Sequence, residues 1–252
     1  MATLSILEPD VPAAAELLLP GSVWQLQGPI DCYSRPGGPA LATQASVGRR
    51  LEILASPAWS GGHGRLRARL LEDGYPFWLE PAALLGQARS AAPWRPPSLA
   101  SSSIAARISR VLAFALAAAE RPNRYLWGGT LGPNFDCSGL LQSAFAAAGI
   151  WIPRDAYQQE RFCQALAVRP GQWQLLRPGD LIFFGLPQRC SHVAIHLGEG
   201  RYLHSSGQAH GRDGIGIDSL SPHSSEPVSE HYRRQLRGAG RVMRCHDGTT
   251  LA

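Results

Sequence analysis

The stretch NFDCSGLLQSAFAAAG, residues 134–149, decides the fold of the C-terminal part of this 252-residue chain. Its apolar residues recur at three- and four-residue steps, which predicts an amphipathic helix that begins near Cys137. Gly149 follows the last apolar turn, where a left-handed residue commonly ends a helix. The expected buried stripe comprises Leu140, Leu141, Ala144, Phe145 and Ala148. The segment therefore predicts a core helix that carries a cysteine in its first turn.

Cys137 stands where a loop enters this helix. The first turn of a helix has unpaired N–H groups and the positive end of the helix dipole, and both favour a thiolate. We therefore expect the pKa of the Cys137 thiol to fall below its ordinary value, and the same N–H groups to be available to an oxyanion. The competing interpretation is a small buried residue at a helix start, because free cysteines are often buried.

Three histidines alternate with apolar residues in HVAIHLGEGRYLHSS, residues 192–206. The GEG segment predicts a turn between two antiparallel strands. If Leu197 faces Arg201 across this turn, His204 lies diagonally from His192 on the same face, and such neighbours are about 7–8 Å apart. One imidazole is then able to orient the other. Together with Cys137 they supply a nucleophile, a base and an orienting group.

Two other interpretations compete for these histidines: an ordinary pair of core histidines and a zinc site. His192 and His196 are four residues apart, which on a strand is about 13 Å, too far for both to bind one ion. The sequence has no HExxH motif and no paired acid beside the histidines. We therefore predict no metal site, and the core pair stays the alternative to catalysis.

Helical periodicity up to Gly149 gives way to strand signals after it. The first helical face comprises Ile104, Ile108, Val111, Leu112 and Ala115. The strand signals are LIFF, HVAIHL, RYLHS and GRVMRC, at residues 181–184, 192–197, 201–205 and 240–245. Helices followed by an antiparallel sheet predict an α+β domain.

The N-terminal third has a different pattern, with short strand signals between Gly- and Pro-rich turns. The strand signals are SVWQLQ, GRRLEIL, RLRARLLE and PFWLE, and the turn-rich segments are GPIDCYSRPGGPA and SPAWSGGHG. This pattern predicts a small antiparallel β-barrel. We therefore divide the chain into an N-terminal arm and barrel at 1–86, a linker rich in Pro, Ser and Ala at 87–103, and the α+β domain at 104–252.

Composition excludes several classes of function. All 24 basic residues are Arg, so the sequence lacks the lysine that P-loop nucleotide binders, PLP enzymes and protein kinases use. The net charge of +5 is modest, and the arginines form no stripe interleaved with aromatic residues. We therefore expect no nucleic-acid partner.

The N-terminus and the cysteines bear on the compartment. Residues 1–20 contain acids and prolines where a signal peptide has a basic segment and an apolar run. The longest apolar run, residues 111–119, is too short to span a bilayer. Five cysteines, odd in number and without a CxxC pair, fit a reducing compartment. We therefore expect a cytoplasmic protein with no membrane partner.

Four blocks of the sequence, taken in order, resemble the signature blocks of the NlpC-type cell-wall cysteine peptidases. They are YLWGGTLGPNFDCSGLLQSAF, RPGDLIFF, SHVAIHLGEG and YLHSSG, within residues 104–245. The resemblance implies a papain-like catalytic domain in which Cys137 is the nucleophile, His192 the general base and His204 the residue that orients it. It also implies that Tyr125 stabilises the oxyanion, for which a packed aromatic beside a glycine turn is the alternative. No metal or organic cofactor is implied.

Members of that family hydrolyse peptidoglycan stem peptides, notably the bond from γ-D-glutamyl to meso-diaminopimelate. LATQASVGRRLEIL and LLEDGYPFWLE resemble the bacterial SH3-like domain of a cytoplasmic subgroup, which acts in recycling on peptides with a free N-terminal L-Ala. The resemblance therefore implies peptides of the L-Ala-γ-D-Glu-diaminopimelate type as substrate. It implies no particular oligomeric state.

Such a substrate needs an acceptor for its amine and a donor for the α-carboxylate of D-Glu. Candidates for the acceptor are Asp73 and Tyr75 in EDGYP, and Asp136 and Ser138 on either side of the nucleophile. EDGYP is equally an ordinary polar turn. Arg154 is the candidate for the donor, with an ion pair to the adjacent aspartate as its alternative.

Some features have no counterpart in the resemblance. His196 stands where the family usually has an aromatic residue, so the cleft edge is expected to differ there. Residues 207–232 are expected to form a long mobile loop, from which His223 or Glu226 would line the pocket. Four thiols are expected to be incidental: Cys32, Cys163, Cys190 and Cys245.

Two other functions stay open from the sequence. One keeps the fold and changes the bond, as in an amidase or acyltransferase that acts on another amide. The other is a non-catalytic module that binds cell-wall fragments. The joint presence of one cysteine and two histidines argues against this second alternative.

Overall fold

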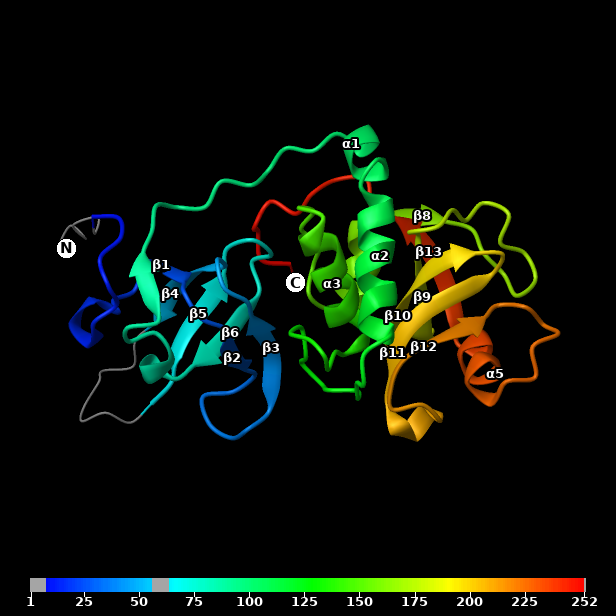
Figure 1. The fold of residues 1–252 in the computed structure, drawn as a ribbon, viewed down its shortest axis with the longest axis horizontal. Helices are drawn as coiled ribbons and strands as arrows, with labels where there is room; N and C mark the ends of the chain where they lie inside the picture. The colour runs from blue at the N-terminus through cyan, green and yellow to red at the C-terminus, as the bar shows by residue number, and fades with distance from the viewer. Residues whose placement is uncertain (1–7, 56–63, 252) are drawn as a thin grey trace. The chain divides into compact units, whose positions relative to one another are not determined.

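The computed structural model describes residues 8–55 and 64–251, which form two compact units (Figure 1). Unit 1 contains the chain up to Pro96 together with Asp247–Leu251, and unit 2 contains Pro97–His246. The chain therefore passes between the units twice. The predicted turn SPAWSGGHG, except for its final glycine, lies outside the described residues.

Unit 1 is built on one antiparallel sheet whose described strands run in the order β3-β2-β6-β5-β4-β1-β7. They are β1 (Val23–Leu26), β2 (Ile30–Tyr33), β3 (Leu41–Ala45), β4 (Arg50–Ala55), β5 (Leu66–Leu70), β6 (Pro76–Leu79) and β7 (Ala88–Ser90). The short 3₁₀ helices η1 (Ala15–Leu17) and η2 (Pro81–Ala83) lie between them or ahead of them. Alternate residues along the strands are buried, such as Trp24 and Leu26 on β1, and these residues form the core of the unit.

Three described strands of unit 1 lie outside the strand signals predicted from the sequence: β2, β3 and β7. β2 lies in the first segment predicted to be turn-rich, because its alternating Ile30 and Cys32 are buried between the flanking Gly and Pro residues. β7 pairs antiparallel with β1 inside the predicted linker, and its Ala88 belongs to the core. The connection without regular structure is therefore shorter than 87–103 and consists of residues 91–100.

Residues after His246 return to unit 1. Gly74 has a positive φ of 65°, and a Cβ atom there would lie 2.3 Å from the carbonyl oxygen of Thr249. The hydroxyl of Thr250 donates a hydrogen bond of 3.0 Å to the carbonyl oxygen of Gly74. Glycine at position 74 therefore lets this last segment pack against the turn between β5 and β6.

Unit 2 is built on a second antiparallel sheet, with described strands in the order β12-β11-β10-β9-β13-β8. They are β8 (Gln164–Leu166), β9 (Leu181–Leu186), β10 (Arg189–Gly198), β11 (Arg201–Ser206), β12 (Gly214–Ser219) and β13 (Leu236–Arg241). Strand β13 begins before the strand predicted at 240–245. Residues 242–245 continue without strand structure.

The hairpin of β10 and β11 has the predicted register. Ile195 lies opposite Leu203, so the two histidines proposed as base and orienting group are diagonal neighbours. At the turn the register shifts by a bulge, in which Gly198 rather than Leu197 faces the start of β11. All three residues of the GEG turn have positive φ, which accounts for the extra residue.

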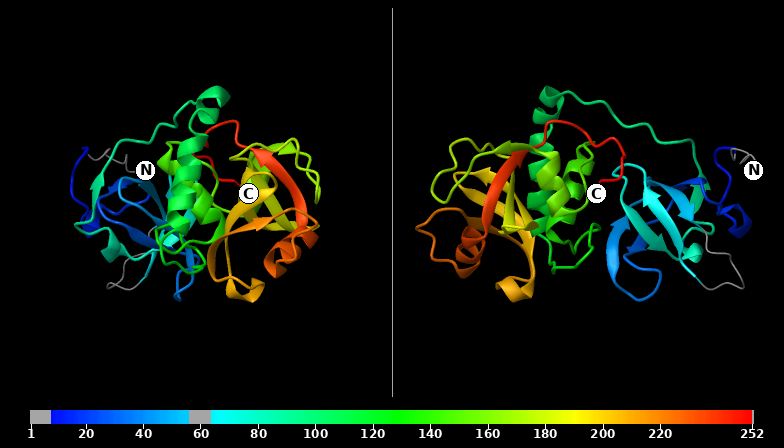
Figure 2. Two further views of the ribbon diagram at one scale, coloured as in Figure 1. Left: turned by 45° about the vertical axis from the view of Figure 1, so that its right-hand side comes forward. Right: turned by 180° about the vertical axis from the view of Figure 1, so that it is seen from behind.

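Helices cover both faces of this sheet (Figure 2). They are α1 (Ser101–Ala105), α2 (Ile108–Ala119), α3 (Cys137–Ala147), α4 (Ala156–Phe162) and α5 (Pro227–Arg234), with the 3₁₀ helix η3 (Gln208–His210). Odd-numbered residues of β9 and β10, such as Leu181 and Val193, pack with α2 and α3. Even-numbered residues, such as Phe184 and Ala194, pack with α5. The alternation of the strands therefore produces two cores.

The helix predicted from residues 134–149 is α3. All five residues of its predicted stripe are buried. Gly149 has a φ of 73° and donates its N–H to the carbonyl of Ala146, and Ile150 donates to the carbonyl of Phe145. These two bonds are the Schellman pattern, so the glycine ends the helix as predicted.

One segment of the described chain, Ser101–Ala119, is long and apolar enough to cross a membrane by length and composition alone. It exceeds the run 111–119 considered from the sequence, because it takes in α1 as well as α2. Its buried residues, Ile104, Val111 and Ala115, belong to the core that α3 shares. Packing in that core accounts for the apolar face of the segment.

The segment 207–232, predicted to be a long mobile loop, contains β12 and most of α5. Its glycines suggested a loop, but one of them has a packing role within the strand. A Cβ atom at Gly216 would lie 2.1 Å from the guanidinium of Arg212, which crosses β12 there. His223 and Glu226 are exposed, and Glu226 is the N-cap residue of α5.

Candidate active site

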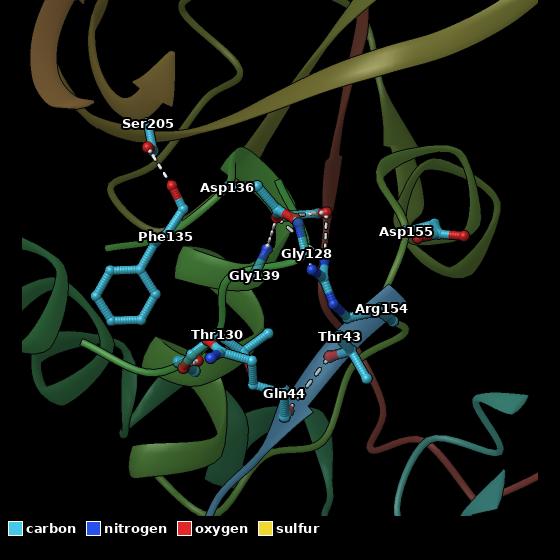
Figure 3. Close-up of polar contacts among 12 residues, drawn as sticks. Thr43, Gln44, Gly128, Thr130, Phe135, Asp136, Gly139, Arg154, Asp155 and Ser205 are labelled. Atoms are coloured by element: carbon cyan, nitrogen blue, oxygen red, sulfur yellow. Dashed lines mark hydrogen bonds and ion pairs between the residues drawn. The ribbon is translucent and has the colours of Figure 1, made fainter. Parts of the chain in front are cut away.

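Asp136 organises the start of α3 (Figure 3). Its Oδ1 accepts a hydrogen bond of 2.7 Å from the N–H of Gly139, which makes Asp136 the N-cap. Its Oδ2 accepts a hydrogen bond of 2.9 Å from the N–H of Gly128 in the glycine turn YLWGG. Arg154 donates to both carboxylate oxygens. The carboxylate therefore ties α3 to the glycine turn and to the segment before α4.

Arg154 is buried, with 2% of its side chain exposed. Its Nη1 donates hydrogen bonds of 3.1 Å to Asp136 and 2.9 Å to the hydroxyl of Ser138. Asp155, the alternative partner expected from the sequence, instead caps α4. The guanidinium therefore supports Asp136 inside the unit, and its binding of the substrate α-carboxylate stays a prediction.

Gly139 lets α3 approach the glycine turn closely. A Cβ atom at this position would lie 2.1 Å from the carbonyl oxygen of Gly129 and 3.0 Å from Oδ1 of Asp136. We expect Gly139→Ala to lower the free energy of unfolding of unit 2 by about 3 kcal/mol, because the backbone must shift. Urea unfolding followed by circular dichroism measures the loss. Gly238→Ala is the matched control, since no atom lies within 4 Å of a Cβ there; equal losses would contradict this packing explanation.

Cys137 is the first residue of α3 and is 6% exposed. The backbone of Val193 and of Ser138 lies close enough to the thiol to lower its pKa, against the larger effect of burial. Val193 directly follows His192 on β10. The structure therefore brings the thiol to the middle of the strand that carries the predicted base.

The pKa of Cys137 differs from the sequence prediction. Burial and the nearby Asp136 carboxylate raise the pKa of the thiol to about 12, against the opposing effect of the hydrogen bonds from Val193 and Ser138. The prediction of a lowered pKa is therefore wrong. The N-cap carboxylate occupies the N–H of Gly139, and its negative charge disfavours a second anion beside it. Cys137 is accordingly a neutral thiol at rest and needs a base.

His192, His204 and Asp218 form a continuous chain of hydrogen bonds. Nε2 of His192 lies 2.7 Å from Nδ1 of His204. Nε2 of His204 lies 2.8 Å from Oδ2 of Asp218. The contact between the histidines follows from the predicted diagonal register. Asp218 was missed, because the strand that carries it lies in the segment predicted to be a loop.

The imidazole of His192 is neutral at neutral pH. Burial lowers the pKa of His192 well below its ordinary value, and the nearby His204, His210 and His231 lower it further. A neutral imidazole is the form that a general base requires. The electrostatics of the thiol and of the imidazole therefore both favour an uncharged resting pair.

Tyr232 is a second residue that the sequence did not indicate. Its ring stacks on His192 with ring centroids 4.3 Å apart and an interplanar angle of 23°. Its hydroxyl lies 2.7 Å from the hydroxyl of Ser206 on β11. These two contacts fix the plane of the His192 imidazole from the α5 side of the sheet.

Tyr125 lies partly buried near the thiol. Burial raises the pKa of its hydroxyl above the ordinary value, and the negative charge of a Cys137 thiolate raises it further. The hydroxyl therefore stays protonated, as a donor to an oxyanion must. Its backbone N–H donates a hydrogen bond of 3.2 Å to Asp213, and its ring lies against Gly207. These contacts agree with an oxyanion donor and equally with a packed aromatic.

The four candidates for binding the substrate amine fall in two places. Asp73 and Tyr75 belong to unit 1, where Asp73 lies 3.0 Å from Nη2 of Arg49 and accepts a hydrogen bond of 3.1 Å from the N–H of Tyr75. These contacts are those of a polar turn. Asp136 and Ser138 are the candidates that the structure brings beside the thiol.

His196 is buried inside the hairpin. Its Nδ1 lies 3.1 Å from the carbonyl oxygen of Arg177, and its Nε2 accepts a hydrogen bond of 3.3 Å from the N–H of Gly200. These bonds brace the GEG turn. Cys32, Cys163, Cys190 and Cys245 are free thiols, as is Cys137. Within residues 8–55 and 64–251, no group of three metal-binding side chains occurs.

Comparison with known proteins places this geometry in context. Residues 122–237 match the NlpC/P60 family. A γ-D-glutamyl-L-lysine dipeptidyl-peptidase of Bacillus cereus is 42% identical over 84 residues, which cover 32% of this chain and 24% of that protein. The peptidoglycan endopeptidase RipB of Mycobacterium tuberculosis is 38% identical over 98 residues, covering 34% of this chain and 38% of that protein. This chain therefore spans less than half the length of these curated relatives.

A solved structure from Staphylococcus aureus, described as similar to a lipoprotein of the NLP/P60 family, also matches. It is 29% identical, with a TM-score of 0.43, and the match covers 55% of this chain and 42% of that one.

Proposed function

We propose that this protein is a cysteine peptidase of peptidoglycan stem peptides, because residues 122–237 match the NlpC/P60 family. The proposed bond joins γ-D-glutamyl to meso-diaminopimelate, in peptides with a free N-terminal L-Ala. The observation that carries the proposal is the chain of hydrogen bonds from His192 through His204 to Asp218, 2.7 Å and 2.8 Å long, on the sheet whose Val193 backbone acts on the Cys137 thiol. A relative that is a γ-D-glutamyl-L-lysine dipeptidyl-peptidase supports the choice of bond.

In the first step, His192 takes the thiol proton of Cys137 as the sulfur attacks the γ-carbonyl carbon of D-Glu. A carbon–sulfur bond forms and the carbonyl oxygen becomes an oxyanion, for which the hydroxyl of Tyr125 and the N–H groups at the start of α3 are the proposed donors. The protonated imidazole then gives its proton to the amine of the diamino acid as the carbon–nitrogen bond breaks. A thioester remains.

In the second step, water attacks the thioester with His192 as base, which releases the L-Ala-D-Glu dipeptide and restores the thiol. The resting protonation states favour this order of events. Burial raises the pKa of Cys137 to about 12 and lowers the pKa of His192, so the proton moves as the sulfur attacks and not beforehand. His192 therefore acts as a general base on a neutral thiol.

For the substrate amine, we propose Asp136 and Ser138 as acceptors. An ionised carboxylate is the stronger partner for an ammonium group, and Asp136 lies beside the nucleophile. From unit 1, we propose Tyr75 and Asp73 as further acceptors for this amine. Asp73 also positions the turn, because it accepts a hydrogen bond from the N–H of Tyr75. Arg154 would then act through Asp136, to which it is bonded.

We further propose that unit 1 is a bacterial SH3-like domain and that the protein recycles wall peptides in the cytoplasm. The antiparallel sheet of short strands supports the first proposal. The second proposal follows from the proposed requirement for a free amine on L-Ala, because the L-Ala nitrogen is acylated while a stem peptide is still attached to its glycan.

The proposal is tested by incubating the full chain with L-Ala-γ-D-Glu-meso-diaminopimelate and identifying the products by mass spectrometry. We expect free diaminopimelate and L-Ala-D-Glu. The N-acetylated peptide should turn over at least about tenfold more slowly, because a charge-assisted hydrogen bond is lost. A third arm with L-lysine in place of diaminopimelate reports the preferred diamino acid.

Each other outcome of this assay replaces one part of the proposal. Equal turnover of the free and acetylated peptides would reject the free-amine requirement. Cleavage of a different amide would favour an amidase or acyltransferase of the same fold. Binding of the peptide by the intact protein without turnover would favour a non-catalytic module that binds cell-wall fragments.

A further inference from the structure

Asp218 ends the chain of hydrogen bonds that begins at His192. It lies on β12 and is buried, with 1% of its side chain exposed. Its Oδ2 lies 2.8 Å from Nε2 of His204 and 2.6 Å from Nη2 of Arg212. Its Oδ1 accepts a hydrogen bond of 2.9 Å from the hydroxyl of Ser229 on α5. Every partner is thus a donor, as an ionised carboxylate requires.

The ionised state of Asp218 has a physical cause. Burial alone would raise the pKa of Asp218, but the hydrogen bond and charge of His204, the charge of Arg212 and the hydroxyl of Ser229 bring it below the ordinary value. These contacts therefore favour the carboxylate form of Asp218.

A carboxylate can only accept, and this fixes the protons of both imidazoles in turn. Nε2 of His204 must carry the proton that Asp218 accepts, so Nδ1 of neutral His204 has a lone pair. That lone pair accepts from Nε2 of His192 across 2.7 Å. Neutral His192 therefore carries its proton on Nε2 and presents an unprotonated Nδ1. This is the nitrogen left to take the thiol proton.

We propose that Asp218 is a positioning residue of the reaction: it sets the tautomers of His204 and His192 so that Nδ1 of His192 is the base, and Arg212 holds it in place. The proposal rests on the proposed function for its kinetic readouts. When Nδ1 of His192 accepts the thiol proton, the positive charge formed there is stabilised through His204 by the carboxylate.

Arg212 is built into this arrangement by its neighbour in the strand. Gly216 lies under the guanidinium, and any side chain at that position would displace it, since a Cβ atom would lie 2.1 Å from Nη1 and 2.4 Å from Cζ. Arg212 is 28% exposed, whereas the aspartate it holds is almost fully buried. The guanidinium and the Ser229 hydroxyl therefore fix the carboxylate from two elements.

The pH dependence gives a readout that a purely structural role would not change. The ionisable groups that contact or act on the two imidazoles are His210 of η3, Arg212 ahead of β12, Asp218 of β12, His231 and Tyr232 of α5, and Tyr202 of β11. The Cys137 thiol of α3 is the proposed partner of His192. Burial lowers the pKa of His204, the bond and charge of Asp218 oppose that shift, and Arg212 adds to it. Loss of either charged group should therefore shift the acid limb, in opposite directions.

The experiment compares Asp218→Ala, Asp218→Asn and Arg212→Gln with the intact full chain. We expect Asp218→Ala to lower kcat on the order of 100-fold, with KM within about threefold, because the acceptor that fixes both tautomers is gone. Asp218→Asn should lose less, since Arg212 favours the amide oxygen at the Oδ2 position. The acid limb of kcat/KM should move to lower pH in Asp218→Asn and to higher pH in Arg212→Gln.

Asp180→Asn is the matched control. Asp180 forms the corresponding buried pair in the same unit, with Arg241 at 2.8 Å and side-chain exposures of 3% and 27%, and it does not contact the imidazoles. We expect it to lose stability to a similar degree while kcat and the acid limb stay within experimental error. Equal losses of kcat in Asp180→Asn and Asp218→Ala, or an acid limb that stays fixed in both charge variants, would overturn the proposal.

The tautomers are also measurable without any substrate. Long-range ¹H–¹⁵N spectra of the full chain labelled at histidine should show His192 and His204 with the proton on Nε2, and a mixture of tautomers in Asp218→Ala. A proton on Nδ1 of His192 in the intact protein would overturn the proposal. Failure of the γ-D-glutamyl peptide assay with the expected tautomers present would instead reject the proposed function alone.

Discussion

Cys137→Ala is expected to abolish hydrolysis of the γ-D-glutamyl peptide while leaving the fold intact. The alanine cannot form the thioester, so the loss should be at least on the order of 10⁴-fold in kcat. The helix should persist, because alanine is a good helix former and Asp136 still caps α3. Mass spectrometry of the products measures the activity, and circular dichroism with thermal unfolding reports the fold.

Cys190 provides the control for this variant. It is buried, and its sulfur donates a hydrogen bond of 3.4 Å to the carbonyl oxygen of His192, so it is the thiol next to the proposed base along the chain. We expect Cys190→Ala to keep kcat within about threefold. The reverse result, an inactive Cys190→Ala beside an active Cys137→Ala, would show that the nucleophile is Cys190 and not Cys137.

His192→Ala is expected to lower kcat on the order of 10⁴-fold and to change the shape of the pH profile. Burial raises the pKa of Cys137 to about 12, so without a base only a minute fraction of the thiol is ionised at neutral pH. The thiolate is the deprotonated form, so residual activity should rise with pH toward that value. The intact protein should instead lose activity only on the acid side, below the ordinary pKa of histidine, where His192 becomes protonated.

His196→Gln separates this effect from a loss of stability. His196 is a buried histidine on the same strand, bonded to Arg177 and Gly200, so its replacement should weaken the hairpin without removing the base. We expect a lower melting temperature with kcat within about threefold. A His192→Ala variant with the pH profile of the intact protein would show that the thiol does not depend on this imidazole.

The contact between the two histidines was predictable because it depends on local information. Val193, Ile195 and Leu203 alternate with the histidines, and a slip of one residue would bring an apolar side chain to the histidine face. The GEG turn then fixes which strand residues pair. The bulge at Gly198 was not anticipated, and it lies between the predicted pairs and the turn without disturbing them.

Asp218 and Tyr232 were not predictable in the same way. Their roles depend on β12 pairing with β11 and on α5 packing over the sheet, and both elements lie in a segment rich in Gly, Ser and Pro. Local composition favours a loop there. The pairing of β12 with β11 and the packing of α5 on the sheet outweigh that preference, and no pattern within the segment reveals these contacts.

The pKa of Cys137 also required the structure. The position of the thiol at a helix start was correct, but the sign of the shift depends on how far the thiol is buried and on where the Asp136 carboxylate points. The sequence indicates an N-cap without indicating that its oxygens already hold Gly128, Gly139 and Arg154. Burial and the negative charge of the Asp136 carboxylate therefore raise the pKa of the thiol, and they outweigh the lowering expected from the helix dipole.

The return of residues 247–251 to unit 1 has a consequence for how the chain is made. A ribosome delivers these residues only after all of unit 2, so the first unit to emerge is the last to be completed. Until then the turn at Gly74 lacks the strip of backbone that covers it. If the chain were divided near Pro96 and the two parts were expressed separately, unit 1 would lack residues 247–251. Unit 2 would then carry these residues without the turn against which they pack.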